Sequence, residues 1–198
     1  KAAKKVDVLN SSVAYDIIQW LKLRAGSDDF SEYESFLLIN HDWPGINFLR
    51  SQGERAIDST VQPTRILNFF AKNEPLTANG AVKYAEALLL NQRKKQARLV
   101  IKRSWLRHSY SASELRQAEL LFGSFLTNLN TQRIDNLLWS DRVAQAEGML
   151  SLVPKDIKLL SQARIALKKR TVGVDFLISK VPRHLKNDPG LFLDRFIY

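Results

Sequence analysis

The 198-residue sequence contains no cysteine and only one methionine. Without cysteine the chain has no disulfide, no thiol nucleophile and no thiolate metal ligand, so packing alone must stabilise it. Long apolar runs are also missing, because even the uncharged segment 120–132 contains six polar residues. The sequence therefore has no candidate membrane span.

Two further absences narrow the class of protein. No window alternates apolar and polar residues with an enrichment of β-branched side chains, so no sheet is predicted. Gly45 and Gly53 do not follow a strand and lack the spacing of a nucleotide-binding loop. His41, His108 and His184 lie in separate segments without further ligands at metal-binding spacing. We therefore expect neither a metal site nor a cofactor.

Basic residues outnumber acidic ones by 30 to 20, which gives a net charge of +10. The charge is unevenly distributed along the chain. Residues 93–107 contain seven basic residues and no acid, whereas residues 27–58 contain seven acids and two arginines. This asymmetry favours an anionic partner at the basic segment.

Residues 27–57 are predicted to form two short helices joined by a sharp turn. Ser31 and Glu34 match a capping box, which predicts that the first helix begins at Ser31. Trp43 and Pro44 are the predicted structural corner, because Pro44 disfavours helical backbone at Trp43 but suits the first turn of the next helix. We expect the Trp43 ring to be buried between the two helices.

Similar segments recur along the chain. Residues 137–154 align with residues 165–182 without a gap at an offset of 28, and both segments end in Val-Pro. A second similarity has an offset of 49, so the period is irregular and does not match a 34-residue tetratricopeptide consensus. Short helix pairs cannot bury their apolar stripes alone, so neighbouring pairs must stack.

The predicted fold is therefore all-α. We expect about ten to twelve short helices in stacked antiparallel pairs, forming a curved, tetratricopeptide-like superhelix. Residues 1–198 are expected to form a single domain of this kind.

The basic segment is predicted to be an amphipathic helix. At about 100° per residue, Ala97, Ile101 and Trp105 fall on one face. The predicted basic face on the opposite side consists of Lys95, Arg98, Lys102, Arg103 and Arg107. It is either an ordinary solvated surface or a docking surface for an anionic polymer. Nucleic acid fits it poorly, because Trp105 lies on the other face and cannot stack on bases there.

A family resemblance rests on hairpin-packing residues along essentially the whole chain. The first group is Trp20, Leu21, Leu23, Arg24, Ala25 and Gly26. The second group is Phe36, Leu37, Asn40, Asp42, Trp43, Pro44, Leu49, Arg50, Glu54, Ala56 and Ile57. Later matches are Val153 with Pro154, residues 163–167 and 188–191, and Asp194, Arg195 and Phe196. Together these resemble the N-terminal α-superhelical domain of soluble lytic murein transglycosylases.

The resemblance implies a periplasmic, non-catalytic region that holds peptidoglycan glycan strands or stem peptides near a separate lysozyme-like domain. Enzymes of this family cleave the β-1,4 bond between N-acetylmuramic acid and N-acetylglucosamine with a single acidic residue, and they form a 1,6-anhydro product. Their Glu-Ser pair is followed by a Gly-rich stretch with Met-Gln, whereas Glu34-Ser35 matches only the dipeptide. We therefore expect this chain to be inactive alone and to be the N-terminal part of a larger protein that continues beyond Tyr198 into the catalytic domain.

Two alternatives remain open from the sequence. The first is a free-standing tetratricopeptide-like adaptor that binds a peptide or protein partner in a concave groove. The second is a basic solenoid that binds nucleic acid, whose affinity would fall steeply with salt.

Overall fold

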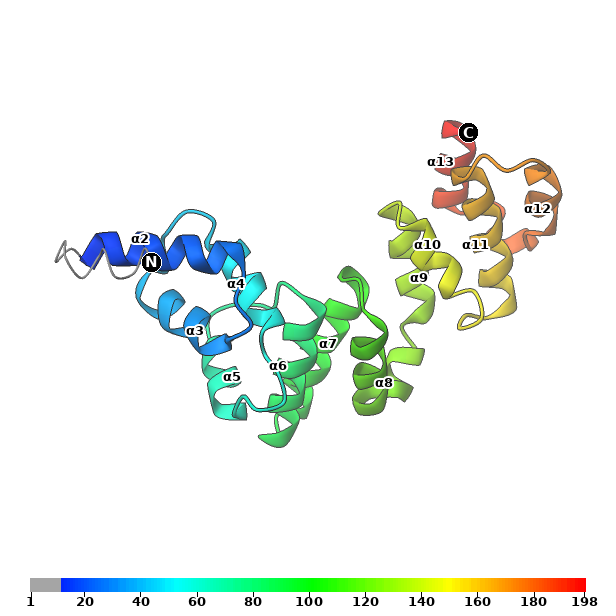
Figure 1. Cartoon of the computed structure of the whole chain (residues 1–198). Coiled ribbons are helices and arrows are strands. Elements are labelled where there is room, and N and C mark those ends of the chain that lie inside the picture. Colours follow the sequence, from blue (N-terminus) through cyan, green and yellow to red (C-terminus); the bar gives the residue numbers. More distant parts are fainter. Residues whose placement is uncertain (1–11) are drawn as a thin grey trace. The chain divides into compact units, whose positions relative to one another are not determined.

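The computed structural model of the protein describes residues 12–198. All regular secondary structure in these residues is helical, with twelve α-helices and one short 3-10 helix (Figure 1). No strand occurs in this part of the chain. The predicted all-α fold of short helices is therefore confirmed.

The described chain divides into two compact units. Unit 1 runs to Ser104 and includes residues 112–114, and unit 2 comprises residues 105–111 and 115–198. Helices α7 (Lys94–Arg107) and α8 (Ala112–Thr127) each contribute residues to both units.

Unit 1 is built from short helices that pack against their neighbours in the sequence. Its other helices are α2 (Ser12–Ala25), α3 (Phe30–Ile39), α4 (Ile46–Arg55), α5 (Pro63–Phe69) and α6 (Ala78–Leu90). α2 packs on α3 and α4, α3 on α4, α4 on α6, and α5 on α6. Contacts between close neighbours along the chain are typical of solenoid-like packing.

Helix α3 does not begin as the sequence predicted. Its N-cap is Asp29, whose carboxylate accepts hydrogen bonds from the Ser31 backbone N (2.8 Å) and Oγ (2.6 Å). Glu34 instead accepts a hydrogen bond from Arg65 Nε on α5 (3.0 Å). The predicted capping box is therefore wrong, because an aspartate two residues earlier caps the helix and a cation from a later helix binds Glu34.

Trp43 and Pro44 lie in the turn between α3 and α4. The half-buried ring of Trp43 meets Phe36 edge-on, with centroids 5.5 Å apart, and the Trp20 indole N–H donates to the Pro44 carbonyl (3.0 Å). Pro44 does not enter α4, which begins only after Gly45 with φ 72°. Pro44 was predicted to lie in the first turn of α4. That position is wrong, because the turn needs one more residue in the left-handed region, which glycine adopts readily.

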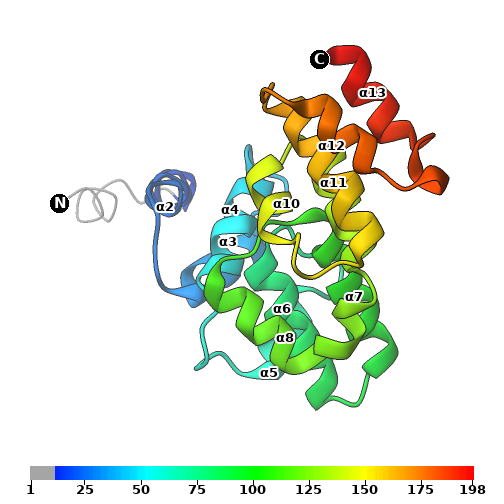
Figure 2. The same cartoon turned by 90° about the vertical axis from the view of Figure 1, so that its right-hand side faces the viewer.

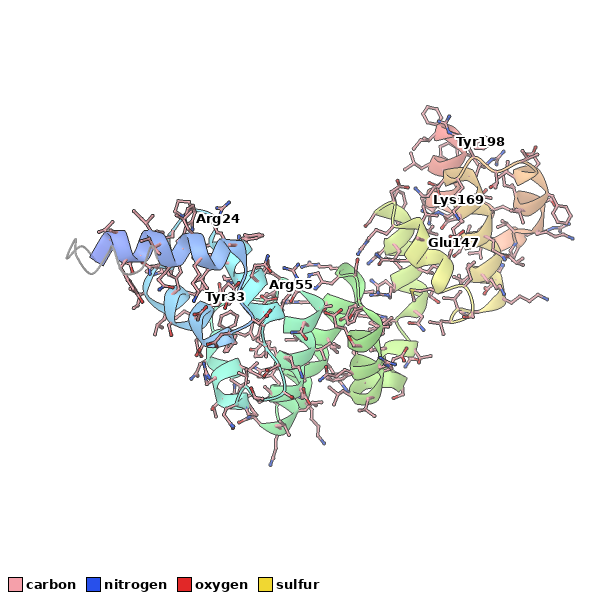
Figure 3. The ribbon with its side chains drawn as sticks, in the orientation of Figure 1. Arg24, Tyr33, Arg55, Glu147, Lys169 and Tyr198 are labelled. Atoms are coloured by element: carbon pink, nitrogen blue, oxygen red, sulfur yellow. The ribbon has the colours of Figure 1, made fainter. Side chains whose placement is uncertain are left out.

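The core of the α3–α4 hairpin depends on a close approach at Gly53. A Cβ atom at Gly53 would lie 2.8 Å from the Cβ atom of Tyr33, so no larger residue fits. Tyr33 is fully buried (Figure 3), and its hydroxyl donates to the Leu23 carbonyl (3.1 Å) and accepts from the Ser27 backbone N (2.9 Å). The close packing of α3 on α4 therefore depends on the absence of a side chain at position 53.

Glu54 joins the end of α4 to the start of α6. Its fully buried carboxylate accepts hydrogen bonds from the backbone N of Leu76 (2.9 Å) and Thr77 (2.7 Å) and from Thr77 Oγ1 (2.8 Å). In return, Asn79 Nδ2 donates to the carbonyls of Glu54 (2.7 Å) and Ile57 (3.1 Å). The two helix ends therefore cap each other. Burial raises the pKa of Glu54, and the hydrogen bonds from Leu76 and Thr77 partly oppose the rise.

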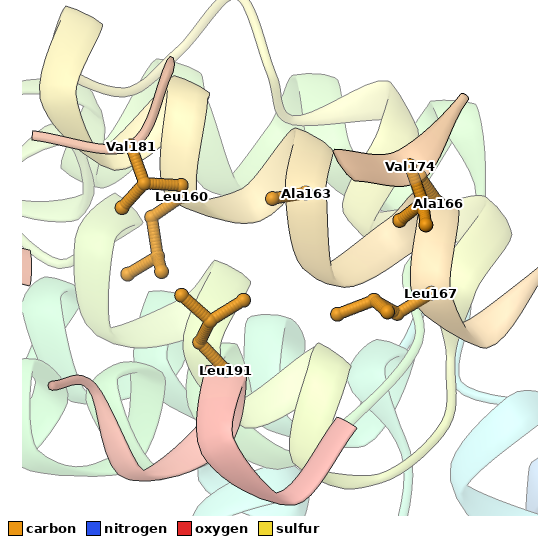
Figure 4. Close-up of a cluster of buried hydrophobic side chains, with 7 residues drawn as sticks. All are labelled: Leu160, Ala163, Ala166, Leu167, Val174, Val181 and Leu191. Atoms are coloured by element: carbon orange, nitrogen blue, oxygen red, sulfur yellow. The ribbon is translucent and has the colours of Figure 1, made fainter. Parts of the chain in front are cut away.

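Unit 2 is organised around α11. Its helices are α9 (Asn130–Trp139), α10 (Val143–Gly148), α11 (Lys155–Lys168), α12 (Val174–Lys180), η1 (Arg183–Leu185) and α13 (Pro189–Ile197). α11 packs against α9, α10, α12 and α13, and its contacts with the last two can be followed in Figure 2. Leu160, Ala163 and Leu167 of α11 form an apolar cluster with Val181 and Leu191 (Figure 4).

A buried arginine connects three helices of unit 2. Arg164 on α11 is only 1% exposed, and its Nε lies 2.7 Å from Asp194 Oδ2 on α13. Its Nη1 lies 2.6 Å from Asp135 Oδ1 on α9, and Lys168 Nζ lies 3.1 Å from Asp194 Oδ1. A Cβ atom at Gly190 would lie 2.2 Å from the Arg164 Cζ atom. The guanidinium therefore fits only because position 190 has no side chain.

Three corners of the chain share one local geometry. At each corner a helix ends and is followed by a non-glycine residue with φ between 52° and 60°. The backbone N–H of the residue after it donates to the carbonyl five positions earlier in the chain. The left-handed residues are Gln92, Asp141 and Arg170. Gln92 and Asp141 are 49 positions apart, which equals the second offset found in the sequence. Asp141 and Arg170 are 29 positions apart, one more than the offset of 28 between segments 137–154 and 165–182. α12 begins at Val174, directly after left-handed Gly173.

Replacing Glu54 with glutamine should destabilise unit 1. The amide N–H2 would face the backbone donors of Leu76 and Thr77, so we expect a loss of about 2 to 3 kcal/mol in the free energy of unfolding. Urea unfolding followed by helical circular dichroism measures the change. The exposed Glu119→Gln variant is the control and should stay within about 0.5 kcal/mol of wild type. An unchanged midpoint for Glu54→Gln would contradict the capping role.

Replacing Asp194 with alanine should destabilise unit 2 more than the same change at Asp135. Asp194 is buried, and its loss breaks the buried ion pair and leaves Arg164 with the half-exposed Asp135 as its nearest carboxylate, at a cost of about 3 to 5 kcal/mol. Asp135 is about half exposed, and its replacement should cost less than about 1 kcal/mol. Thermal melts compare the two, and we expect a drop in Tm of roughly 10 °C for Asp194→Ala. Equal effects would show that burial does not control the strength of these ion pairs.

Candidate functional site

A cavity of about 350 Å³ opens among α5, α6 and the start of α7. All of its lining residues belong to unit 1. They are Thr64, Leu67, Asn68, Ala71, Tyr84, Arg93 and Gln96. This volume is within the range of small-molecule sites, so the cavity, called the α5–α7 cleft below, is the candidate binding site.

One wall of the α5–α7 cleft is apolar and aromatic. The half-buried ring of Tyr84 stacks on Phe70 at 4.8 Å and 28°, and Phe70 in turn meets Phe69 edge-on at 5.1 Å. Leu67 and Ala71 add further apolar surface. Because Tyr84 is held by the packing of α5 against α6, the wall is preorganised for an apolar ligand face.

The rest of the α5–α7 cleft is polar and has unused hydrogen-bonding capacity. Thr64, Asn68, Arg93 and Gln96 are exposed. Within residues 12–198, none of these four side chains forms a hydrogen bond or an ion pair. A hydroxyl, two amides and a guanidinium are therefore available to a ligand beside the aromatic wall.

Arg93 has a fixed backbone position at the start of α7. Its backbone N donates to the Leu88 carbonyl (2.8 Å), and its own carbonyl accepts from the Ala97 backbone N (3.0 Å). Lys94 and Lys95 follow, and the first turn of α7 contains no acid. A helix N-terminus already has a partial positive charge, so these cations make a region of positive potential at the cleft.

The predicted basic face lies along α7, and all five of its residues are exposed. Lys95, Arg98, Lys102 and Arg103 belong to unit 1, and Arg107 belongs to unit 2. Arg103 is ion-paired with Glu74. The opposite face is buried at Ala97, Ile101 and Trp105, so the predicted amphipathic character of this helix is confirmed.

The residues of the α5–α7 cleft were not predicted from the sequence, apart from the basic segment that contains Arg93. Thr64 and Asn68 come from α5, Tyr84 from α6, and Gln96 from α7, so no local motif connects them. The one available signal was a helix start with basic residues and no acidic cap.

A second group of cations lies in unit 2 around Arg133. Arg133 is buried and donates hydrogen bonds to the carbonyls of Trp105 and His108, the latter at 3.4 Å. Its guanidinium lies 4.2 Å from the Trp105 ring centroid and 5.2 Å from that of Tyr110. Burial lowers the pKa of Arg133 to about 10. The arginine caps the end of α7, where a positive charge is favourable, so its role is structural.

His108 is partly buried beside these cations. Burial lowers the pKa of its imidazole, and the charges of Arg107, Arg142 and Arg133 lower it further. His41 and His184 lie elsewhere, and His184 Nε2 is 3.4 Å from Asp156 Oδ2. Among residues 12–198, no group of three or more histidine or acidic residues could hold a metal ion.

Glu34 and Glu54 are both engaged by other groups of the protein. Glu54 has a raised pKa, but it is fully buried and its oxygens accept the capping hydrogen bonds described above. Glu34 is bound to Arg65. Every helix in residues 12–198 is too short or too polar to span a bilayer.

No protein-family model, curated protein or solved structure matches this chain.

Replacing Arg142 with glutamine should raise the pKa of His108. The wild-type pKa of His108 is below its ordinary value of 6.5, so the unfolded chain takes up a proton more readily and stability declines as the pH falls below 6.5. Removing one of the three arginine charges should make this decline smaller. An NMR titration of the imidazole measures the pKa, and urea unfolding at about pH 7.5 and about pH 5.5 measures the stability.

The control for this experiment is Arg183→Gln, at an exposed arginine of η1 that does not contribute to the pKa shift of His108. It should leave the titration unchanged. A lowered or unchanged pKa in Arg142→Gln would contradict the assigned electrostatic cause.

Proposed function

We propose that this chain is a non-catalytic helical region of a soluble lytic murein transglycosylase and that its α5–α7 cleft binds peptidoglycan glycan strands. The proposal includes a periplasmic location and a role in cell-wall turnover, next to a catalytic domain of the same protein. The observation that carries glycan binding is the combination of an aromatic wall and free polar side chains in one cleft. The family, the location and the role in cell-wall turnover are proposed from the resemblance of the hairpin-packing residues.

Sugar recognition requires the two kinds of surface that the α5–α7 cleft combines. A pyranose ring has an apolar face of C–H groups that packs on an aromatic ring such as Tyr84. Its hydroxyl and acetamido groups need planar side chains that donate and accept hydrogen bonds, as Asn68 and Gln96 can. A cavity of about 350 Å³ has room for a single sugar residue.

The carboxylates support a binding role and not a catalytic one. Cleavage of a glycosidic bond needs a carboxyl group that reaches the bond oxygen and has a raised pKa. Glu54 has the raised pKa but no access, and Glu34 is held by Arg65. In this proposal the catalytic acid comes from the separate lysozyme-like domain.

A second candidate function is that of an adaptor for a peptide or protein partner. It is favoured by the exposed apolar face of α13, where Phe192 is 73% and Phe196 82% exposed. Exposed aromatic residues of this size are typical of protein-docking surfaces. A protein partner would bind there, in unit 2, and not in the α5–α7 cleft.

Cosedimentation with purified cell-wall sacculi tests the proposed function. At about 0.15 M salt, where nonspecific attraction of a basic protein is largely screened, the chain should pellet with the sacculi. The double variant Asn68→Ala with Tyr84→Ala should pellet several-fold less, because it loses the stacking wall and one amide. The Phe192→Ser with Phe196→Ser variant is the control and should bind as wild type does.

The same incubation should release no soluble anhydro-muropeptides. Failure of the wild-type chain to pellet would contradict glycan binding. Loss of pelleting only in the Phe192 and Phe196 variant would favour the adaptor function. Release of anhydro products would contradict the non-catalytic role.

A further inference from the structure

We infer that the α5–α7 cleft selects a sugar that carries a carboxylate, and that Arg93 binds this carboxylate. The inference rests on the proposed function, because it names the charge of the sugar within the glycan site. Arg93 would then be the residue that distinguishes N-acetylmuramic acid from the neutral N-acetylglucosamine.

Arg93 is an unneutralised cation in the α5–α7 cleft. None of the seven lining residues is acidic, and within residues 12–198 the Arg93 side chain has no carboxylate partner. Its planar guanidinium can donate two parallel hydrogen bonds to one carboxylate, a geometry that a neutral hydroxyl cannot match. A carboxylate on the ligand would therefore be the only negative charge beside this arginine.

The start of α7 is rich in cations and contains no acid. α3 and α13 begin with the acidic caps Asp29 and Asp188, and α6 begins at Thr77, beside the Glu54 carboxylate. α4, α5, α9 and α10 also begin without an acid in the first turn. Among the helices of residues 12–198, only α7 begins with three consecutive cations, Arg93, Lys94 and Lys95. Cations at a helix N-terminus are unfavourable, so a bound anion would stabilise this end.

The rest of the cleft shows that the anion belongs to a larger molecule. Tyr84 and Leu67 form an apolar wall of the same cavity, which a free inorganic ion would leave uncovered. A ligand that fills the cavity contacts both this wall and Arg93. N-acetylmuramic acid has the required chemistry, because it is N-acetylglucosamine with an added lactyl ether that ends in a carboxylate.

The test compares four probes by NMR titration of the isotopically labelled 198-residue chain. The probes are N-acetylglucosamine, N-acetylmuramic acid, N-acetylmuramoyl-L-alanine and D-lactate. We expect N-acetylmuramic acid to bind roughly tenfold more tightly than N-acetylglucosamine, with shifts at the amides of Asn68, Tyr84 and Gln96. D-lactate should bind more weakly than either sugar. The advantage of the charged sugar should shrink as salt is added.

The alanyl probe identifies the source of the carboxylate in a glycan strand. In N-acetylmuramic acid the carboxylate belongs to the lactyl group, whereas in the alanyl probe it belongs to the first residue of a stem peptide. Tighter binding of N-acetylmuramic acid assigns the site to the lactyl group of a strand without peptide. Tighter binding of the alanyl probe assigns the site to the stem peptide. In both cases Arg93 binds the carboxylate.

Arg93→Gln and Arg142→Gln form a matched pair of variants. Both arginines directly follow a left-handed corner residue, but only Arg93 lines the α5–α7 cleft. Arg93→Gln should bind N-acetylmuramic acid only as well as N-acetylglucosamine, and Arg142→Gln should bind both sugars as wild type does. Circular dichroism shows whether each variant keeps its helical content.

Each contrary result has a distinct meaning. Equal binding of the two sugars, or no effect of Arg93→Gln, would overturn the carboxylate assignment and leave glycan binding intact. D-lactate binding as tight as that of N-acetylmuramic acid would show a plain anion site and overturn the inference. Absence of binding by every sugar and by sacculi would overturn the proposed function itself.

Discussion

The constraint on which both units depend is the need to satisfy polar backbone groups at buried helix ends. A short helix has as many unpaired N–H and C=O groups as a long one, so a stack of short helices contains many of them. In unit 1 the Glu54 carboxylate accepts hydrogen bonds from backbone N–H groups at the start of α6. The Asn79 side chain donates a hydrogen bond to a backbone carbonyl at the end of α4. One pair of side chains thereby fixes the position of one hairpin against the next.

Unit 2 uses a buried side chain of the opposite charge for the same kind of connection. Arg164 of α11 binds Asp194 of α13 and Asp135 of α9, so three helices share one guanidinium. Both buried charges require space that a glycine supplies, at Gly80 beside Glu54 and at Gly190 beside Arg164. In each unit the buried charged side chain can be accommodated only beside a glycine, because a side chain at that glycine would collide with the buried group.

The α5–α7 cleft depends on this frame. Tyr84, its aromatic wall, is on α6, whose start is held by Glu54, and Arg93 lies at the corner that follows the same helix. The packing therefore places the ring of Tyr84 and the backbone of Arg93 beside one cavity, while the polar side chains that line it stay unpaired. This is the cleft that we propose as the binding site for a charged sugar.

The sequence by itself determined the all-α class and the buried face of α7, because apolar periodicity acts between residues three or four positions apart. Tertiary structure alone decided that Glu54, and not Glu34, is buried, and that α5, α6 and α7 enclose a cleft. The capping partners of Glu54 lie 22 and 23 positions away. The local sequence pattern around a carboxylate does not indicate which distant backbone group it will contact. That contact is determined by the packing of one hairpin on the next.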